Sequence, residues 1–441
     1  MPKGILENVW KRYLRAAEIL GYEDEIIEEL TSFKGCHSMD IDATVGGRKK
    51  RLNAVRVWHR GPLTDAIRKG GNRYMEGVTL DSLQSHAAEM STKSWLHELP
   101  YAGAKGGIDV DPHKCTPEEL EEITYKFVDE LNEVNMIGPF RDVPAPDIGT
   151  NSLIMFWMAE RYKYLHRGEP FVKAVVTGKP VKIENAYVGG IHGRVDATGY
   201  GLCIVLDELK KLGCLPKNIH ERPIVVIQGF GNVGMHAALY AQRLGHQIIA
   251  ITDKFGGVYR GVGLDIPALI KYALAQKPTT VAGFPGTEPI TNEVLLGLPC
   301  DYLLPCALEE VITADNANGV QAKVIIEGAN GPTTPEADSI LEEKGVMVVP
   351  DILANSMGLV VSFFEWAMNT DHKDPRLPKR NEKGTVLGAG EKMMRNAVAG
   401  VVERAKKHNV LLRPATYIDA LEKAELLRIR RIPSYAAKVL V

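Results

Sequence analysis

Three lysines and one aspartate in the first third of the chain have types and neighbours that suit acid/base or anion-binding chemistry. Lys105 stands in ELPYAGAKGGIDVDP, residues 98 to 112, among glycines and alanines that give it little cover. Lys69 has glycines beside it in RKGGNRY, and glycine lets a ligand approach the main chain closely. The stretch around Lys105 is not a phosphate-binding P-loop, which needs another glycine spacing and a Ser or Thr after the lysine. We interpret the segment around Lys105 as a tight turn.

Each of these side chains also has an ordinary interpretation. Most lysines are solvated surface charges, and Lys93, twelve residues before Lys105, has no local feature that argues otherwise. Asp147 lies in PAPDIGT and could cap the helix that follows. The residues alone leave both alternatives open.

A glycine-rich motif, GFGNVG, directly follows the apolar segment PIVVIQ and opens a helix. In a dinucleotide-binding loop the first glycine allows the turn, the second lets the pyrophosphate approach, and the third lets helix and strand pack closely. The N–H groups at the helix start then face the phosphates. The alternative is a structural turn. The residues predicted to bind a cofactor here are Gly229, Phe230, Gly231, Asn232, Val233 and Gly234.

Asp253 ends the next apolar segment, within the ~30 residues that the dinucleotide fingerprint spans. Its carboxylate can accept hydrogen bonds from the ribose hydroxyls and repels a 2′-phosphate, which favours NAD. Lys254 could instead pair with that phosphate. The choice between NAD and NADP therefore stays open.

Two regions of different pattern must position these residues. Up to about residue 195, spacing predicts helices over 4–32, 79–97 and 152–165 and a strand over 50–59. Thr116, Pro117 and Glu119 predict a helix that starts with a capping box. FRDVPAPDIGTN predicts a rigid proline loop. Beyond residue 195, continuous apolar runs such as CDYLLPCA and VMVVPDI are typical of buried parallel strands.

We therefore expect an α/β protein of two domains, since 441 residues exceed one ordinary core. Residues 1–195, completed by C-terminal helices over 355–441, form a substrate-binding and oligomerisation domain. Residues 196–354 form a Rossmann-type dinucleotide-binding domain.

Composition excludes several classes of function. A net charge of −2 gives no broad basic surface for nucleic acid, and no run of about 18 apolar residues could span a membrane. Six cysteines without a CxxC pair indicate reduced thiols, so we expect a cytoplasmic protein. The histidines form no HExxH or similar set, so we expect no metal.

Over nearly its whole length, the chain resembles the glutamate, leucine, phenylalanine and valine dehydrogenase family. The motifs that carry the resemblance are KGGNRY, LPYAGAKGGIDVDP, DVPAPDIGTN, VVTGKPV, DATGYG, IQGFGNVG, IEGANGPTTPEAD and DILANSMGLVVSFFEW. The resemblance implies an NAD(P)-dependent oxidoreductase that reversibly deaminates L-glutamate to 2-oxoglutarate and ammonia. It also implies a homo-oligomer, a hexamer in this family.

The resemblance also implies a role for each matching residue. Lys105 is the catalytic lysine and Asp147 is its acid/base partner. Lys69 binds the side-chain carboxylate of the substrate and Lys93 its α-carboxylate. The remaining substrate positions are Gly70, Ala145, Asn355, Leu359 and Ser362, and Thr198 and Asn330 match positions that hold the nicotinamide amide. Neighbouring cations and burial should lower the pKa of Lys105 toward ~7–8, where it can trade protons.

Two other functions stay open. A leucine- or phenylalanine-type amino acid dehydrogenase would place apolar residues at Lys69 and Ser362. A non-catalytic nucleotide-binding regulator would have no need of Lys105 and Asp147. Segments near 63–68 and 182–188 are longer than the family pattern, and the sequence does not predict their effect.

Overall fold

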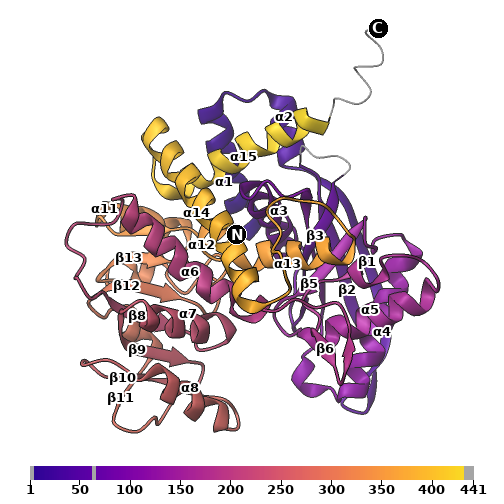
Figure 1. The fold of residues 1–441 in the computed structure, drawn as a ribbon, viewed down its shortest axis with the longest axis horizontal. Helices are drawn as coiled ribbons and strands as arrows, with labels where there is room; N and C mark the ends of the chain where they lie inside the picture. Colours follow the sequence, from indigo (N-terminus) through magenta and orange to yellow (C-terminus); the bar gives the residue numbers. More distant parts are fainter. Residues whose placement is uncertain (1–3, 62–65, 432–441) are drawn as a thin grey trace. The chain divides into compact units, whose positions relative to one another are not determined.

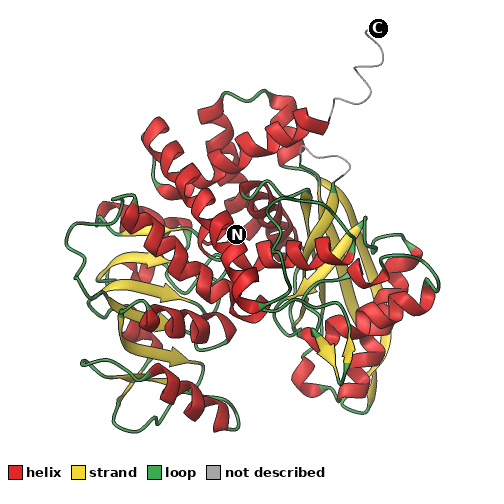
Figure 2. Ribbon diagram, viewed as in Figure 1, coloured by secondary structure: helices red, strands yellow, loops and turns green. Residues whose placement is uncertain are grey.

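The computed structural model describes residues 4–61 and 66–431. The chain divides into two compact units (Figure 1). Unit 1 comprises Met1–Gly193, Leu359–Ala389 and Tyr417–Val441, and unit 2 comprises Arg194–Gly358 and Gly390–Thr416. Unit 1 has a five-stranded sheet and a two-stranded one, and unit 2 has a seven-stranded sheet; their strands are the yellow arrows in Figure 2. The α/β class predicted from the sequence is confirmed.

Unit 1 contains both helices and strands. In chain order they are α1 (Ile5–Leu20), α2 (Asp24–Leu30), β1 (Phe33–Val45), β2 (Arg48–His59), β3 (Ile67–Tyr74), α3 (Leu80–Leu96), β4 (Tyr101–Ile108), η1 (Pro112–Lys114), α4 (Pro117–Glu133), β5 (Asp142–Pro146), α5 (Ser152–Leu165), η2 (Val172–Val175), β6 (Lys182–Ile183) and β7 (Ala186–Tyr187). The helices predicted over 79–97 and 152–165 and the strand predicted over 50–59 are confirmed as α3, α5 and β2. The predicted capping box at the start of α4 is also present.

The five-stranded sheet of unit 1 has the order β1-β2-β4-β3-β5. β4, β3 and β5 run parallel, whereas β1, β2 and β4 are antiparallel neighbours. Apolar side chains of α4 and α5 pack with Ile108 and Tyr74 on one face of the sheet. On the other face, Val55 and Val57 of β2 pack against Leu83 and Ala87 of α3.

From its glycines we predicted a tight turn around Lys105. This prediction is wrong, because the segment forms the buried strand β4. The glycines let α3 approach the strand. A Cβ at Gly103 would lie 1.8 Å from the carbonyl oxygen of Ala87, and the Gly103 N–H donates to the Ser91 hydroxyl at 2.7 Å. Part of the predicted proline loop is likewise a strand, β5. Non-local packing overrides the low strand propensity of glycine and proline here.

Unit 2 contains a seven-stranded sheet and the helices around it. Its elements are α6 (Arg194–Lys211), β8 (Ile224–Gln228), α7 (Asn232–Arg243), β9 (Gln247–Asp253), β10 (Gly256–Tyr259), α8 (Ile266–Ala275), β11 (Glu288–Ile290), α9 (Asn292–Leu296), β12 (Cys300–Pro305), α10 (Ala314–Ala317), β13 (Ala322–Ile326), α11 (Pro335–Glu343), β14 (Met347–Val349) and α12 (Asp351–Ala354). Three later helices, α13 (Met357–Asn369), α14 (Lys383–His408) and α15 (Leu412–Arg431), each contribute residues to both units.

The sheet of unit 2 has the order β11-β10-β9-β8-β12-β13-β14, and β9, β8, β12, β13 and β14 run parallel, as the apolar runs predicted. After β8 the chain forms β9 on one side, and later returns to form β12 on the other. Ligands of such sheets bind outside the carboxyl ends of the strands at this reversal of order. The glycine motif follows β8 at that point.

None of the helices within residues 4–61 and 66–431 is both long enough and apolar enough to cross a bilayer.

Candidate functional site

Strand alternation places Lys69 and Lys105 on one face of the five-stranded sheet of unit 1. Lys69 of β3 pairs with Gly103 of β4, so Lys69 and Lys105 point to the same side. This is the side that α3 covers, because a Cβ at Gly103 would strike α3. Both lysines are buried, at 1% and 3% exposure. The alternative that they are solvated surface charges is therefore wrong.

Lys105 forms an ion pair with Asp147, whose side chain is 16% exposed. Arg73 of β3 joins them, because its Nε donates to Oδ2 of Asp147 at 2.9 Å. Asp147 lies over Gly71, where a Cβ would come within 2.7 Å of the Asp147 Cβ. The structure thus brings one carboxylate and two cations together on one face of three neighbouring strands, β4, β3 and β5.

Asp147 does not cap the helix that follows it. The side chain of Asn151 accepts hydrogen bonds from the N–H groups of Leu153 and Ile154, and Asn151 is the N-cap of α5. The capping alternative for Asp147 is therefore wrong, and its carboxylate is available to Lys105 and Arg73.

Burial lowers the pKa of Lys105 most. Asp147 opposes this shift, Arg73 and Lys93 add to it, and the resulting pKa is about 8. The direction predicted from the sequence is confirmed. Burial alone would raise the pKa of Asp147, but Lys105 and Arg73 outweigh it and hold that pKa well below its usual value. Lys105 can therefore exist neutral or charged near neutral pH, and the resting carboxylate of Asp147 beside it is ionised.

A chain of buried contacts fixes the ammonium of Lys69. Its Nζ donates to the Thr177 hydroxyl at 2.7 Å. The next N–H in the chain, from Gly178, donates to Oε2 of Glu365 at 2.8 Å, and the Lys179 ammonium lies 2.7 Å from Oε1 of the same carboxylate. Glu365 belongs to α13, which also carries Ser362 and Leu359 at 2% and 8% exposure. The contacts tie α13 to β3 within unit 1.

The other substrate positions in unit 1 are also buried. Lys93 lies on α3 at 5% exposure. Burial raises the pKa of Glu89, one helical turn away, but His86 and then Lys93 outweigh it and lower that pKa. Ala145 of β5 pairs with Gly71 of β3. A Cβ at Gly70 would lie 1.5 Å from the carbonyl oxygen of Ala104. Glycine is required at this position for strand packing, whatever its contact with a substrate.

The glycine motif of unit 2 has the geometry of a dinucleotide loop. Gly229 has a φ of +96°, which side chains disfavour. A Cβ at Gly234 would lie 1.9 Å from the carbonyl oxygen of Gly229, whereas a Cβ at Gly231 would meet nothing within 4 Å. Gly231 is the N-cap of α7 and no side chain caps it. These residues fit a pyrophosphate, because there is room above Gly231 and the first N–H groups of α7 have no side-chain acceptor there.

Asp253 ends β9 as expected, and its carboxylate already holds two main-chain groups. Oδ1 accepts from the N–H of Phe255 at 2.8 Å, and Oδ2 accepts from the N–H of Val281 at 2.7 Å. A carboxylate has about four lone-pair sites, so it retains capacity for ribose hydroxyls. The ammonium of Lys254 lies over the ring of Phe255, 4.9 Å from its centroid.

The remaining predicted positions lie in unit 2. The Asn355 amide donates to Oδ1 of Asn330 at 3.1 Å, so these two side chains meet. Thr198 lies on α6, and its hydroxyl would be 2.6 Å from a Cβ at Gly358. The structure therefore groups the predicted cofactor residues, together with Asn355, in unit 2 and the other substrate residues in unit 1.

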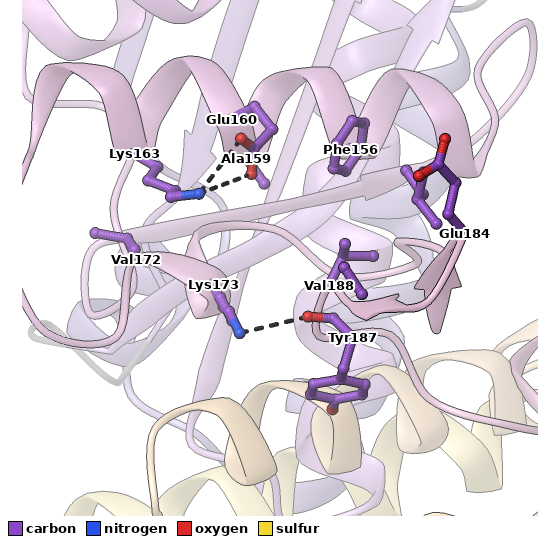
Figure 3. A pocket seen from close by; sticks show the side chains of 11 residues that line it. Phe156, Ala159, Glu160, Lys163, Val172, Lys173, Glu184, Tyr187 and Val188 are labelled. Carbon is purple, nitrogen blue, oxygen red and sulfur yellow. Dashed lines mark hydrogen bonds and ion pairs between the residues drawn. The ribbon is translucent and has the colours of Figure 1, made fainter.

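A separate hollow of about 460 Å³ lies between α5 and the β6–β7 hairpin (Figure 3). Its lining includes Lys163, which pairs with Glu160, and Lys173, which donates to the carbonyl oxygen of Tyr187. It contains none of the predicted site residues. The hairpin accounts for the long segment near 182–188, whereas residues 62–65 of the other long segment lie outside the described residues.

Sequence analysis missed three residues that support the lysines. Arg73 lies in RKGGNRY, four residues after Lys69, and the alternation of side chains along a strand would have placed both on one face. Thr177 was in VVTGKPV, and Glu365 was in LVVSFFEW. Nothing local indicates that these last two meet Lys69 or Lys179, because their contacts join segments far apart in the chain.

Comparison with protein families gives two matches. A family described as Glutamate/Leucine/Phenylalanine/Valine dehydrogenase matches residues 189–430. A second, described as Glu/Leu/Phe/Val dehydrogenase, dimerisation domain, matches residues 36–164.

Individual relatives match over almost the full length. A glutamate dehydrogenase of Thermotoga maritima is 40% identical over 430 residues, covering 96% of this chain and 97% of that protein. An NADP-specific glutamate dehydrogenase of Synechocystis is 37% identical, with 96% of each chain covered. An NAD-specific glutamate dehydrogenase A of Halobacterium salinarum is 36% identical, covering 96% of this chain and 92% of that protein.

Among solved structures, the hetero-hexameric glutamate dehydrogenase of Thermus thermophilus, in a Leu-bound form, has a TM-score of 0.86 to this chain. Its sequence identity is 32%, and 98% of each chain is covered.

Proposed function

The chain belongs to the glutamate/leucine/phenylalanine/valine dehydrogenase family, and on that premise we propose that it reversibly deaminates L-glutamate to 2-oxoglutarate and ammonia with NAD(P). The observation that carries the choice of substrate is the buried ammonium of Lys69, held by Thr177 on the same sheet face as Lys105. A pocket for an apolar side chain would gain nothing from a cation there.

The substrate's two carboxylates need two cations once they leave water. We assign the side-chain carboxylate to Lys69 and Ser362, and the α-carboxylate to Lys93. Gly70, Ala145 and Leu359 are assigned to the pocket wall. Fixing both ends of the substrate would orient its Cα and amine toward Lys105 and Asp147.

Lys105 performs proton transfer in this proposal. When bound, the nicotinamide supplies the acceptor for the hydride from Cα. With a pKa of about 8, Lys105 in its neutral form takes a proton from the water that attacks the imine carbon. The resulting ammonium then stabilises the negative charge that develops on the oxygen. Asp147 takes protons from the substrate amine and returns them to the departing ammonia.

The cofactor is assigned to unit 2, with the pyrophosphate at Gly229–Gly234, the ribose at Asp253 and the nicotinamide amide at Thr198 and Asn330. The relatives include NAD-specific and NADP-specific enzymes, so dependence on NAD(P) follows from the family. Preference for NAD is our proposal, supported by the Asp253 carboxylate, which repels a 2′-phosphate. Asn355, bonded to Asn330, is assigned to the substrate edge of that site.

We also propose that the protein works as a homohexamer. The match to the dimerisation domain covers residues 36–164, and the Thermus relative is hexameric by description. Light scattering on the purified protein tests the assembly, and a monomeric mass would contradict it.

Steady-state assays with both cofactors and a panel of amino acids test the function. We expect reduced nicotinamide to form with glutamate far faster than with leucine or phenylalanine. A preference for either apolar substrate would support the second family activity. Binding of cofactor without turnover of any amino acid would support a nucleotide-binding regulator instead.

A further inference from the structure

Arg73 contacts the acid/base pair but has no part in the proposed binding of substrate or cofactor. Arg73 lies on β3 at 2% exposure, and its Nε donates to Oδ2 of Asp147 at 2.9 Å. The Nζ of Lys105 makes its closest contact with the same oxygen. Two cations from neighbouring strands therefore converge on one oxygen of the carboxylate.

The second oxygen of Asp147 is in a different position. Within the part of the chain that the structure describes, no hydrogen bond reaches Oδ1. A Cβ at Gly71 would lie 3.3 Å from Oδ2, so the missing side chain gives the carboxylate room over β3. Asp147 is thus anchored through Oδ2, and Oδ1 is the oxygen that can meet a ligand.

The two cations on Oδ2 differ in their chemistry. Lys105 must lose its ammonium charge during part of the reaction, and it then holds the carboxylate less strongly. Arg73 stays protonated at all relevant pH values, and its planar guanidinium fixes the direction of each N–H. The contact from Arg73 therefore persists when the contact from Lys105 weakens.

We propose that Arg73 is a positioning residue that holds Asp147 through Oδ2 in both protonation states of Lys105, so that Oδ1 exchanges the proton with the substrate amine. In this step an N–H bond of the amine breaks as an O–H bond forms at Oδ1, and the reverse transfer returns the proton to nitrogen. No electrons leave the substrate in the step. The inference deepens the proposed function and rests on it.

Charge around the pair makes this testable through pH. The charged groups that face Asp147 and Lys105 are Arg73 from β3 and Lys93 from α3, besides the pair itself. Burial lowers the pKa of Lys105 most, and Arg73 and Lys93 lower it further. Removing the charge of Arg73 should therefore raise that pKa and move the neutral form of Lys105 to higher pH.

The first experiment compares kcat and KM for glutamate across pH in wild type and Arg73→Gln. In the wild type, kcat/KM for deamination should rise with pH around a midpoint near 8, where Lys105 loses its proton. In Arg73→Gln the midpoint should move up by about one unit, which lowers kcat about tenfold at neutral pH. KM should change about twofold or less, because the carboxylates are bound by other residues. An unchanged midpoint and kcat would overturn the inference.

Arg56→Gln is the matched control. Arg56 of β2 is fully buried and bonds to Asp142 on the opposite face of the same sheet. Both variants remove a buried Arg–Asp pair, so both should lower the melting temperature. Only Arg73→Gln should shift the pH midpoint, and an equal shift in Arg56→Gln would overturn the inference.

Arg73→Lys retains the positive charge, and it replaces Arg73→Gln in these measurements if the Gln variant does not fold. It should keep the wild-type midpoint, and a shifted midpoint would contradict the charge argument.

A measurement that does not depend on catalytic turnover distinguishes failure of the role given to Arg73 from failure of the proposed function. The rate at which Lys105 reacts with an amine-directed reagent, followed by mass spectrometry across pH, reports its neutral form. The midpoint of that rate should move up in Arg73→Gln as the kinetic midpoint does. An unchanged labelling midpoint in a protein that deaminates glutamate would refute the role of Arg73 alone. A labelling shift in a protein that never deaminates glutamate would refute the proposed function and, with it, the assignment of Oδ1 to the substrate amine.

Discussion

Replacing Lys69 with Leu and Ser362 with Val removes the two polar groups assigned to the side-chain carboxylate of glutamate. Lys69 is 1% exposed, so a carboxylate that reaches it has left water and depends on that cation. Removing one partner of such a buried, hydrogen-bonded charge pair costs ~2–5 kcal/mol. At about 1.4 kcal/mol per tenfold, kcat/KM for glutamate should fall by about 30-fold to several thousand-fold.

The same change turns the far end of the pocket apolar, and activity on unbranched apolar substrates should appear. Leu359, on the helix that carries Ser362, should crowd branched side chains more than straight ones, so norleucine should be a better substrate than leucine. The assay is steady-state kinetics on glutamate, norleucine and leucine in wild type, both single variants and the double variant.

Thr177→Val is the matched control for this experiment. It removes the hydroxyl that accepts from Lys69 and leaves the ammonium in place. Loss of one hydrogen bond costs ~1 kcal/mol, so the fall in kcat/KM should be only several-fold. An unchanged preference for glutamate in the double variant would refute the reasoning, since the side-chain carboxylate would then bind elsewhere.

Three further predictions follow from the structure. Lys105→Ala should lose several orders of magnitude in kcat while binding reduced cofactor normally by fluorescence, and near-normal turnover would contradict the assignment of Lys105. Asp253→Ser should narrow the gap in kcat/KM between NAD and NADP, because it removes the charge that repels a 2′-phosphate. A wild type that strongly prefers NADP would contradict the role given to Asp253. Thr116→Ala should cost ~1 kcal/mol in the free energy of unfolding by denaturant titration, because Thr116 accepts from the Glu119 N–H in the capping box.

Structural features that depend on a few adjacent residues could be predicted from the sequence. The capping box of α4 depends on Thr116 and Glu119 alone, and the dinucleotide loop depends on one strand, one turn and one helix. Parallel strands in unit 2 were also predictable, because strands buried on both faces are continuously apolar.

Features that depend on distant segments could not be predicted in this way. The glycines around Lys105 indicate a turn when considered alone, yet they form a strand because α3 packs directly on Gly103. The partners of Lys69 come from VVTGKPV, more than one hundred residues later. The pairing of Lys105 with Asp147 was inferred from the family resemblance, since no local pattern joins them.

Product analysis with isotopically labelled glutamate tests the central claim most directly. The wild-type protein, incubated with glutamate and excess NAD or NADP, should release 2-oxoglutarate, ammonium and reduced cofactor in equal molar amounts. Lys105→Ala, shown to bind cofactor, should release none of the three above background. A folded, cofactor-binding wild type that forms no 2-oxoglutarate, or that reduces the cofactor only with leucine or phenylalanine, would contradict the account.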